Sequence, residues 1–459
     1  MRRYGIATAA ALGALWVTGS AVRAAGGTDA PPVPALTDAA AGEVAPPADE
    51  AALEEQPATS DTPQVTPLVL TGYVDVGFAK AQGDGTSFHP ADSRAPLDYG
   101  VDPFAPAVNS RGEAASTDPG TDLSGNPRFV NGFLPRSAGI GGTPSFLLNT
   151  ANVDFRYTSA ELPVLVFSRV QLVPRLEGGA GELTRVFLEQ AFGRIAPIKS
   201  AELAITVGKF DSVFGIEYLE NQANFRIGIT PSLLARYTTG TSVGAKVFYR
   251  IQLIPISSAL SINVSGTNSG TFVEALQGPS RSLTGVPVLT ARLGYDLNLA
   301  RLSIKLGASV ERGPRNDQND RGTMQTLYGA DLRIFVAGLT VMGELVKVEE
   351  EEGNPNKLAG TGAYTFTSDF YARGFWVQAA YELPLPIAPF RITPYARYEQ
   401  RHGEFVSFAA IVVDRITAGL NVGIGENLIV KGEYLLNREL EGAPTVANNV
   451  ITSSVVWTW

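Results

Sequence analysis

The sequence predicts an all-β fold: a transmembrane antiparallel β-barrel of about sixteen strands. Three observations lead to this prediction. Apolar and polar residues alternate along segments close to the ~10 residues of a tilted membrane strand, and longer than the ~5 to 6 of soluble strands. Short and long connections alternate along the chain. The polar faces carry fixed charges, which a dry core does not tolerate and a water-filled interior does.

The first 66 residues lie outside the predicted barrel. Residues 1–24 begin with a basic pair, continue with an apolar run and end in small residues, which is the pattern of a secretory signal peptide. Residues 25–66 are rich in Ala, Pro and acids and contain no Lys or Arg, so we expect a disordered segment that spaces or tethers the barrel. The barrel domain is then 67–459. Its formal charge is -4, compared with -9 for the whole chain, because residues 1–66 hold eight acids and three arginines.

The connections define the strands in order. The first strand begins at Leu68, where apolar residues alternate with Thr71, Tyr73 and Asp75. Short turns are predicted at 159–163, 196–200, 255–258, 298–300, 337–338, 383–389 and 423–427. Longer, more polar connections are predicted at 81–145, 174–181, 209–240, 265–286, 311–322, 348–369, 401–409 and 438–446. The even strand number puts both termini on the short-turn side, which we expect to be periplasmic.

The two predicted strands within residues 201–253 flank a charged connection that is too long for an ordinary hairpin. Both strands have one apolar and one polar face, with Phe248 as the single misfit on the second strand. The connection 209–240 carries acids and bases among aromatic residues and glycines. The candidate functional residues of this connection are Lys209, Asp211, Glu217, Glu220, Arg226 and Arg236. The competing interpretation is that several of them form solvated ion pairs that only hold the loop.

Aromatic residues near the predicted strand ends favour a membrane barrel over a soluble one. They are Tyr371, Phe375, Trp376, Tyr381, Phe390, Tyr395 and Tyr398. Such positions are typical of interfacial girdles. A soluble β-sandwich or barrel also alternates with period two and remains the alternative fold.

Composition argues against several kinds of chemistry. Cysteine is absent, which excludes disulfides and thiolate metal sites. No basic surface for nucleic acid, no phosphate-binding Gly loop and no zinc spacing is present, so we expect no cofactor and no metal. The two histidines, His89 and His402, fall in or near predicted loops and are more simply explained as solvated. The acidic run Glu349 to Glu352 is either a solvated loop or a weak divalent-cation site.

Short motifs resemble a known family. Val207-Gly208-Lys209-Phe210 and Phe214-Gly215-Ile216-Glu217 are similar to a passage of phosphate-selective porins and related β-barrel porins of Gram-negative bacteria. The last strand ends on Trp459, similar to the terminal aromatic residue of outer-membrane barrels, which is usually Phe. The resemblance implies an outer-membrane homotrimer in which the loop after strand 5, here residues 209–240, folds inward and narrows a pore. By this resemblance, the six candidate residues of that loop form the pore constriction.

We therefore expect an outer-membrane porin, in contact with lipid, that passes small hydrophilic solutes or ions. The predicted pore wall consists of Arg156, Arg169, Lys246, Arg250, Arg292, Arg333 and Arg397. Acids on the same polar faces, among them Asp154, Glu344 and Glu399, predict a mixed lining and weak selectivity. The alternatives are a plugged structural or anchoring barrel and an outer-membrane barrel hydrolase, which would need a poised His or paired acids. We expect no enzyme.

Overall fold

The computed structural model describes thirteen segments of the chain. They are 68–81, 145–159, 162–177, 181–198, 201–220, 222–253, 257–268, 287–314, 324–350, 371–385, 388–405, 408–440 and 449–459. The predicted signal peptide and acidic segment, His89 and most of the predicted long connections lie outside these residues.

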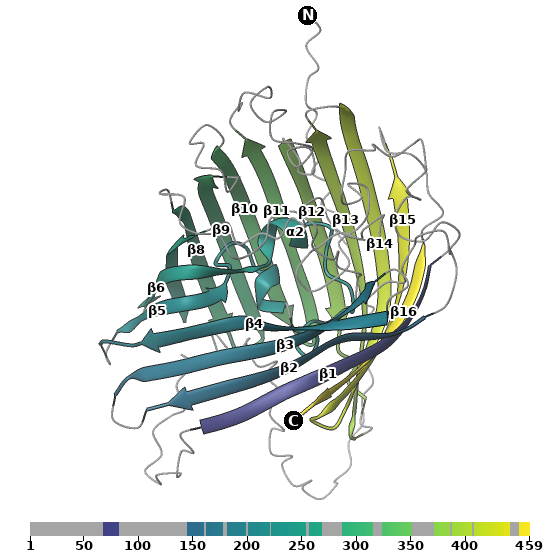
Figure 1. The fold of residues 1–459 in the computed structure, drawn as a ribbon, viewed down its shortest axis with the longest axis horizontal. Coiled ribbons are helices and arrows are strands. Elements are labelled where there is room, and N and C mark those ends of the chain that lie inside the picture. The colour runs from purple at the N-terminus through teal and green to yellow at the C-terminus, as the bar shows by residue number, and fades with distance from the viewer. Residues whose placement is uncertain are drawn as a thin grey trace, which may run out of the picture. The chain divides into compact units, whose positions relative to one another are not determined.

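Sixteen antiparallel strands form one closed barrel, in which each strand pairs with its neighbours in sequence and β1 pairs with β16 (Figure 1). The strands are β1 Leu68–Ala81, β2 Ser145–Thr158, β3 Val164–Glu177, β4 Gly181–Ile195, β5 Glu202–Asp211, β6 Thr241–Leu253, β7 Ser258–Thr267, β8 Val288–Leu299, β9 Leu302–Pro314, β10 Met324–Val336, β11 Leu339–Glu350, β12 Tyr371–Tyr381, β13 Phe390–Phe405, β14 Phe408–Ile424, β15 Leu428–Glu439 and β16 Val450–Thr458. The predicted fold class and strand number are confirmed.

Two predicted long connections are wrong. β3 runs through the proline-containing segment and pairs with β4 as far as Glu177 opposite Gly181. β13 and β14 likewise pair as far as Phe405 opposite Phe408, so His402 lies within a strand. Continued ladder pairing outweighs the local turn signals of Pro, Gly and charged residues in these segments.

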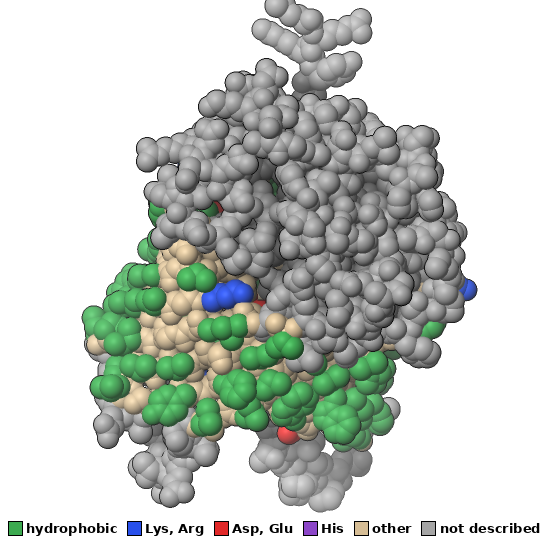
Figure 2. All heavy atoms as spheres, in the orientation of Figure 1, with side chains coloured by type: hydrophobic (Ala, Val, Ile, Leu, Met, Phe, Trp, Pro, Cys, Tyr) green, Lys and Arg blue, Asp and Glu red, His purple; other side chains and the backbone are tan. Residues whose placement is uncertain are grey.

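Alternation along the strands separates an apolar outer face from a polar inner face. Outward residues such as Val186, Leu289 and Trp457 are 66%, 58% and 64% exposed. Figure 2 shows hydrophobic side chains spread across the described surface that is visible in this view, with few charged groups among them. Phe248, the misfit in the pattern, lies between Lys246 and Arg250 on the inner face of β6 and is half-buried, so the alternation of β6 is unbroken.

Two aromatic residues assigned to the girdle lie inside instead. Trp376 is 4% exposed, and its Nε1 donates to Oε2 of Glu344 at 3.3 Å. Tyr395 is 5% exposed and donates its hydroxyl proton to Oε1 of Glu433 at 2.7 Å. Their polar ring atoms therefore belong to the interior network, whereas Tyr381, Phe390 and Tyr398 remain exposed on the outside.

The C-terminal residue completes the seam between β1 and β16. The backbone N–H of Trp459 donates to the carbonyl of Gly72, and Gly72 N–H donates to the carbonyl of Trp459. A Cβ atom at Gly72 would lie 2.5 Å from Cζ2 of Trp459 and 2.3 Å from the carbonyl oxygen of Asn152, so only glycine leaves room for the indole. Trp459 itself is 47% exposed.

The described helices are short. They are η1, a 3-10 helix at Glu217–Glu220, and α2 at Ala235–Thr238, both in the connection between β5 and β6. Within the described ranges no helix has the length and apolar character to cross a membrane.

Candidate functional site: the inner loop and its wall contacts

The connection between β5 and β6, residues 212–240, is here named the inner loop; residue 221 lies outside the described part. It closes at its base, where Ser212 N–H donates to the carbonyl of Gly240 at 3.0 Å. Its other contacts are with inward-facing residues of strands on several sides of the barrel, and Figure 1 shows α2 within the ring of strands. The inner loop is therefore held inside the barrel by its wall.

An apolar cluster fixes the loop against β10, β11 and β12. Phe214, Leu234 and Tyr237 of the loop are at most 2% exposed. They pack with the wall residues Leu327, Met342, Val346, Val348, Ala372 and Trp376. Wall glycines make space for this contact: a Cβ atom at Gly329 would lie 2.7 Å from Cζ of Phe214, and one at Gly374 would lie 2.5 Å from Cδ2 of Leu234.

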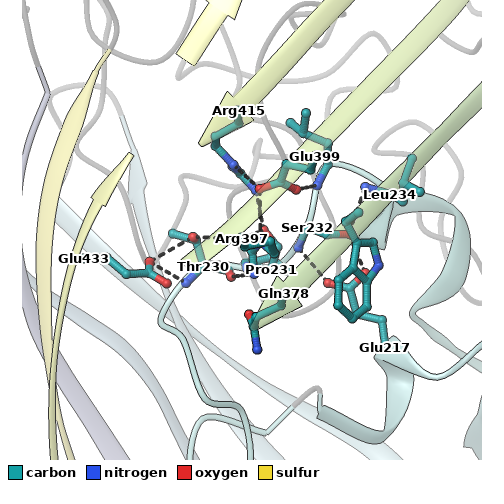
Figure 3. Close-up of polar contacts among 12 residues, drawn as sticks. Glu217, Thr230, Pro231, Ser232, Leu234, Gln378, Arg397, Glu399, Arg415 and Glu433 are labelled. Atoms are coloured by element: carbon teal, nitrogen blue, oxygen red, sulfur yellow. Dashed lines mark hydrogen bonds and ion pairs between the residues drawn. The ribbon is translucent and has the colours of Figure 1, made fainter. Parts of the chain in front are cut away.

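Glu433 of β15 binds backbone N–H groups of the loop. Its Oε1 accepts from Ile229 N–H at 2.8 Å, and its Oε2 accepts from Thr230 N–H at 3.0 Å and the Thr230 hydroxyl at 2.9 Å (Figure 3). Burial of unpaired N–H groups is unfavourable, so a buried carboxylate that accepts three bonds holds this turn in place.

Glu399 of β13 lies at the centre of a second contact (Figure 3). It accepts from Leu233 N–H at 2.6 Å and from the guanidinium groups of Arg397 at 3.1 Å and Arg415 at 2.6 Å. The two arginines in turn donate to the loop, both to the carbonyl of Pro231, at 3.0 and 2.5 Å. Glu399, Arg397 and Arg415 are at most 4% exposed. Charge compensation and loop binding thus occur in one buried network.

Other wall residues bind the middle of the loop. Lys431 of β15 donates to the carbonyls of Ala223, Arg226 and Gly228. On the far side of the seam, the hydroxyl of Tyr73 on β1 accepts from Ala223 N–H at 3.3 Å, and Asn152 of β2 donates to Gln222. The loop is anchored to β1 and β2 as well as to β9–β15.

Within the inner loop, Glu217 of η1 is hydrogen-bonded to Ser232, which lies before α2. It accepts from Ser232 N–H at 2.6 Å and from the Ser232 hydroxyl at 2.5 Å. Burial raises the pKa of Glu217, and the two bonds from Ser232 act in the opposite direction. Gly215 nearby has φ +71°, a left-handed conformation that suits glycine, and a Cβ atom there would overlap Oε1 of Glu344.

The predicted constriction residues do not form one group. Glu220 is the clearest lumen-facing member: its Oε1 lies 3.2 Å from Nη2 of Arg333, and the two side chains are 14% and 28% exposed. Asp211 is buried and accepts from Gln190 at 2.5 Å. Glu217 and Arg226 are buried, and burial lowers the pKa of Arg226.

The two remaining predicted constriction residues are Lys209 and Arg236. Lys209 shares the outward side of β5 with the exposed Val207, and its Nζ donates to the carbonyl of Leu188 at 2.7 Å. Its assignment to the constriction is wrong, because β5 continues through Asp211 and keeps its alternation at this position. The backbone of Arg236 is in α2, but its side chain lies outside the described part of the structure.

The predicted wall residues lie on inner faces, and most are paired with acids. Arg169 forms two bonds of 2.7 Å to Asp154. Arg292 lies 2.6 Å from Asp331, and Arg250 lies 3.2 Å from Asp296 and 3.7 Å from Glu202. Lys246 sits 5.0 Å from the ring centroid of Phe210. Arg156 is on the inner face of β2, and Arg397 binds the loop as described above.

Sequence reasoning missed the anchoring role of Arg415, Lys431, Tyr73 and Asn152. Period two places each on a polar face, but no local signal shows that it binds a loop 70 to 208 residues away in the chain. Among the described residues, no group of three His, Asp or Glu side chains is arranged to hold a metal ion. The site is thus a polar surface of mixed charge inside the barrel.

Fold and site together define a class: a closed sixteen-stranded antiparallel β-barrel with an apolar exterior and its own loop fixed in a polar interior. No family model and no curated protein matches the chain. Among solved structures it is similar to the outer-membrane expressed OmpT of Vibrio cholerae, the outer membrane channel DcaP of Acinetobacter baumannii and an anion-selective porin from Comamonas acidovorans. Identities are 11%, 11% and 9%, with TM-scores of 0.47, 0.48 and 0.45. Each comparison covers 85% of this chain and 97%, 97% and 99% of the other. Similarity at this level assigns no function.

Proposed function

We propose that this protein is an outer-membrane porin, a water-filled channel for passive diffusion of small hydrophilic solutes or ions. The observation that carries the proposal is the inner loop, which is fixed by buried charges inside a closed barrel whose outside is apolar. An apolar exterior suits lipid, and a charged interior suits water. Because the wall holds the loop in one position, the loop narrows the lumen and does not move to close it.

The lining supports weak selectivity. Bases and acids occur as pairs along the inner face of β6–β10: Arg250 with Asp296, Arg292 with Asp331, and Arg333 with Glu220 of the loop. Because each base faces an acid, the field across the lumen orders polar solutes more than it excludes one sign of ion. Phosphate selectivity receives no support from these pairs. A homotrimer with periplasmic termini remains part of the proposal.

We infer no catalytic role. His402 lies on the outward side of β13, directly opposite Arg373, with its ring centroid 6.4 Å from that of Tyr371. It is therefore away from the interior, where the loop and the polar wall meet. A hydrolase would instead need an activated nucleophile beside a base.

The test is single-channel recording of the purified mature protein in a planar bilayer, with the reversal potential measured under a salt gradient. We expect steps of uniform size and a reversal potential close to zero. Silence from a protein that still shows a folded barrel on gels would contradict the porin and favour a plugged structural barrel. Ester or peptide hydrolysis by the same sample would favour the hydrolase.

A further inference from the structure

The outer face of the barrel carries basic side chains near the end where residues 351–370 join β11 to β12. Three outward basic residues stand side by side on adjacent strands: Lys347 of β11 is directly opposite Arg373 of β12, which is directly opposite His402 of β13. Lys347 is 47% exposed, and Arg373 is exposed. Their outward direction follows from Leu345 and Tyr328, exposed neighbours on the same face.

The row of Lys347, Arg373 and His402 is extended into a belt by two more basic residues in the neighbouring register rows, Arg312 and Arg438. Arg312 of β9 donates to Thr326 of β10 at 2.8 Å, one register step nearer the strand ends. Arg438 of β15, 47% exposed, pairs with Asp414 of β14 at 2.6 Å, one step further from the ends. The basic belt is thus defined by Arg312, Lys347, Arg373, His402 and Arg438. The described acids on it are Glu349 and Asp414, while the side chain of Glu404 lies outside the described residues.

Below the belt the outer face is uncharged. The next register row contains Val377, Tyr398, Ile416 and Leu436, and the row after that contains Val341, Ala379, Ala396, Ala418 and Tyr434. Elsewhere at this end of the barrel, outward bases are opposite uncharged residues: Lys80 of β1 is opposite Ile451, and Lys209 of β5 is opposite Ala191 and Val243. At the corresponding end of β6–β8, the outward residues include the exposed apolar Val243, Val264 and Leu289.

Arg373 is the centre of this arrangement. The residues directly opposite it on both neighbouring strands, Lys347 and His402, are basic. Side chains in such positions have Cβ atoms about 5 Å apart, so the positive charges of Lys347 and Arg373 repel each other. Glu349 offsets part of the charge, since its Oε1 lies 2.5 Å from Nζ of Lys347. An anion above Arg373 would stabilise the row.

We propose that the basic belt binds the anionic phosphate headgroups of membrane lipids at the edge of the leaflet on this side. The inference rests on the proposed membrane location. The apolar rows take the acyl chains, and the belt lies where a headgroup layer begins. Tyr371, over whose ring Lys347 Nζ lies at 5.8 Å, provides an amphipathic contact of the kind found at such boundaries.

The experiment measures lipid retained on the detergent-purified mature protein by native mass spectrometry. The probes are phosphatidylglycerol, phosphatidylcholine with the same acyl chains, and inorganic phosphate. We expect preferential retention of phosphatidylglycerol by the natural protein. The Lys347→Gln/Arg373→Gln double variant should bind it on the order of 10-fold more weakly, because each surface base contributes to attraction of an anionic lipid.

Matched controls separate this effect from a general loss of charge. The Lys80→Gln/Lys209→Gln double variant removes two outward lysines on β1 and β5, away from the belt, and should retain phosphatidylglycerol as the natural protein does. The Lys347→Arg/Arg373→Lys variant keeps the charge and should also retain it.

Three outcomes would overturn the proposal. They are equal retention of the two lipids by the natural protein, equal loss in the Lys80/Lys209 control, and full displacement of the lipid by inorganic phosphate, which would indicate a site for free anions. If the test variant does not fold, the comparison of the two lipids on the natural protein still tests the proposal.

Channel recordings run in parallel separate this inference from the proposed porin function. Open channels without lipid preference contradict only this inference, and silent protein with lipid preference contradicts only the porin.

Discussion

At the scale of single residues, the interior charges divide into two groups by burial. Glu399, Glu433, Arg415 and Lys431 are at most 3% exposed and bind loop backbone. Breaking a buried pair by removing one partner is expensive, about 3 to 5 kcal/mol, because the remaining charge is uncompensated. Glu220 and Arg333 differ because both are partly exposed, so in the proposed channel we expect their charges to affect solutes in the lumen more than stability.

We predict opposite effects on ion preference from the two members of this exposed pair. Glu220→Gln should shift the reversal potential toward anions and Arg333→Gln toward cations, since each change leaves the partner's charge facing the lumen. The expected change is roughly twofold in the permeability ratio, as a screened charge contributes about 0.2 to 1 kcal/mol. Recordings of both variants under one salt gradient measure it. Lys209→Gln, on the outer face, should have no effect; shifts of the same sign in Glu220→Gln and Arg333→Gln would contradict the assignment.

At the scale of elements, the inner loop and the wall of β10–β12 fit each other through large loop side chains and small wall residues. Phe214 lies over Gly329, and Leu234 lies over Gly374. Glycine in a strand weakens the sheet slightly, and here the loss is offset by close approach of the loop. The lumen shape therefore depends on residues that carry no charge and no polar side chain.

We predict that Gly329→Ala displaces the loop. The new methyl group would lie 2.7 Å from Cζ of Phe214, in a cluster with little room to adjust, and such overpacking destabilises by about 1 to 3 kcal/mol. Channel recordings should show altered and noisier conductance, together with a lower melting temperature. Ala330→Val, which adds volume on the outward side of the same strand, is the matched control and should behave like the natural protein. Conductance and melting unchanged by Gly329→Ala would show that the loop is not held by this contact.

At the scale of the whole molecule, stability depends on closing the sheet. A sheet with an open edge exposes unpaired N–H and C=O groups, which lipid cannot satisfy. The β1–β16 seam removes that edge, and Trp459 extends it through two backbone bonds with Gly72. Because the inner loop also contacts Tyr73 on β1 and Lys431 on β15, the loop and the seam support each other.

We predict that Gly72→Val prevents closure. A side chain there would overlap the carbonyl oxygen of Asn152 on β2 as well as the indole of Trp459, so both neighbours of β1 would have to move. The folded, heat-modifiable form on gels should be strongly reduced. Val76→Leu, at an outward and exposed position of the same strand, should fold normally. A compact heat-modifiable band from Gly72→Val in normal yield would contradict the role of this seam.

The sequence by itself determined the strand number, the closed antiparallel fold and the face on which most charges lie. These follow from period two, which is a local property of each strand, and from the even count of strands. It also determined that acids and bases share the inner faces, as the Arg292–Asp331 and Arg169–Asp154 pairs illustrate.

Only the tertiary structure decided what each inner charge does. Glu433 and Thr230 are separated by 203 residues in the chain, so nothing near either position shows that they bond. The same reason explains the errors at Trp376 and Tyr395. Their positions near predicted strand ends indicated a girdle, but their polar ring atoms are bonded to interior acids. Which side chains meet water and which meet the loop is set by where the inner loop lies, and that depends on shape complementarity between distant segments.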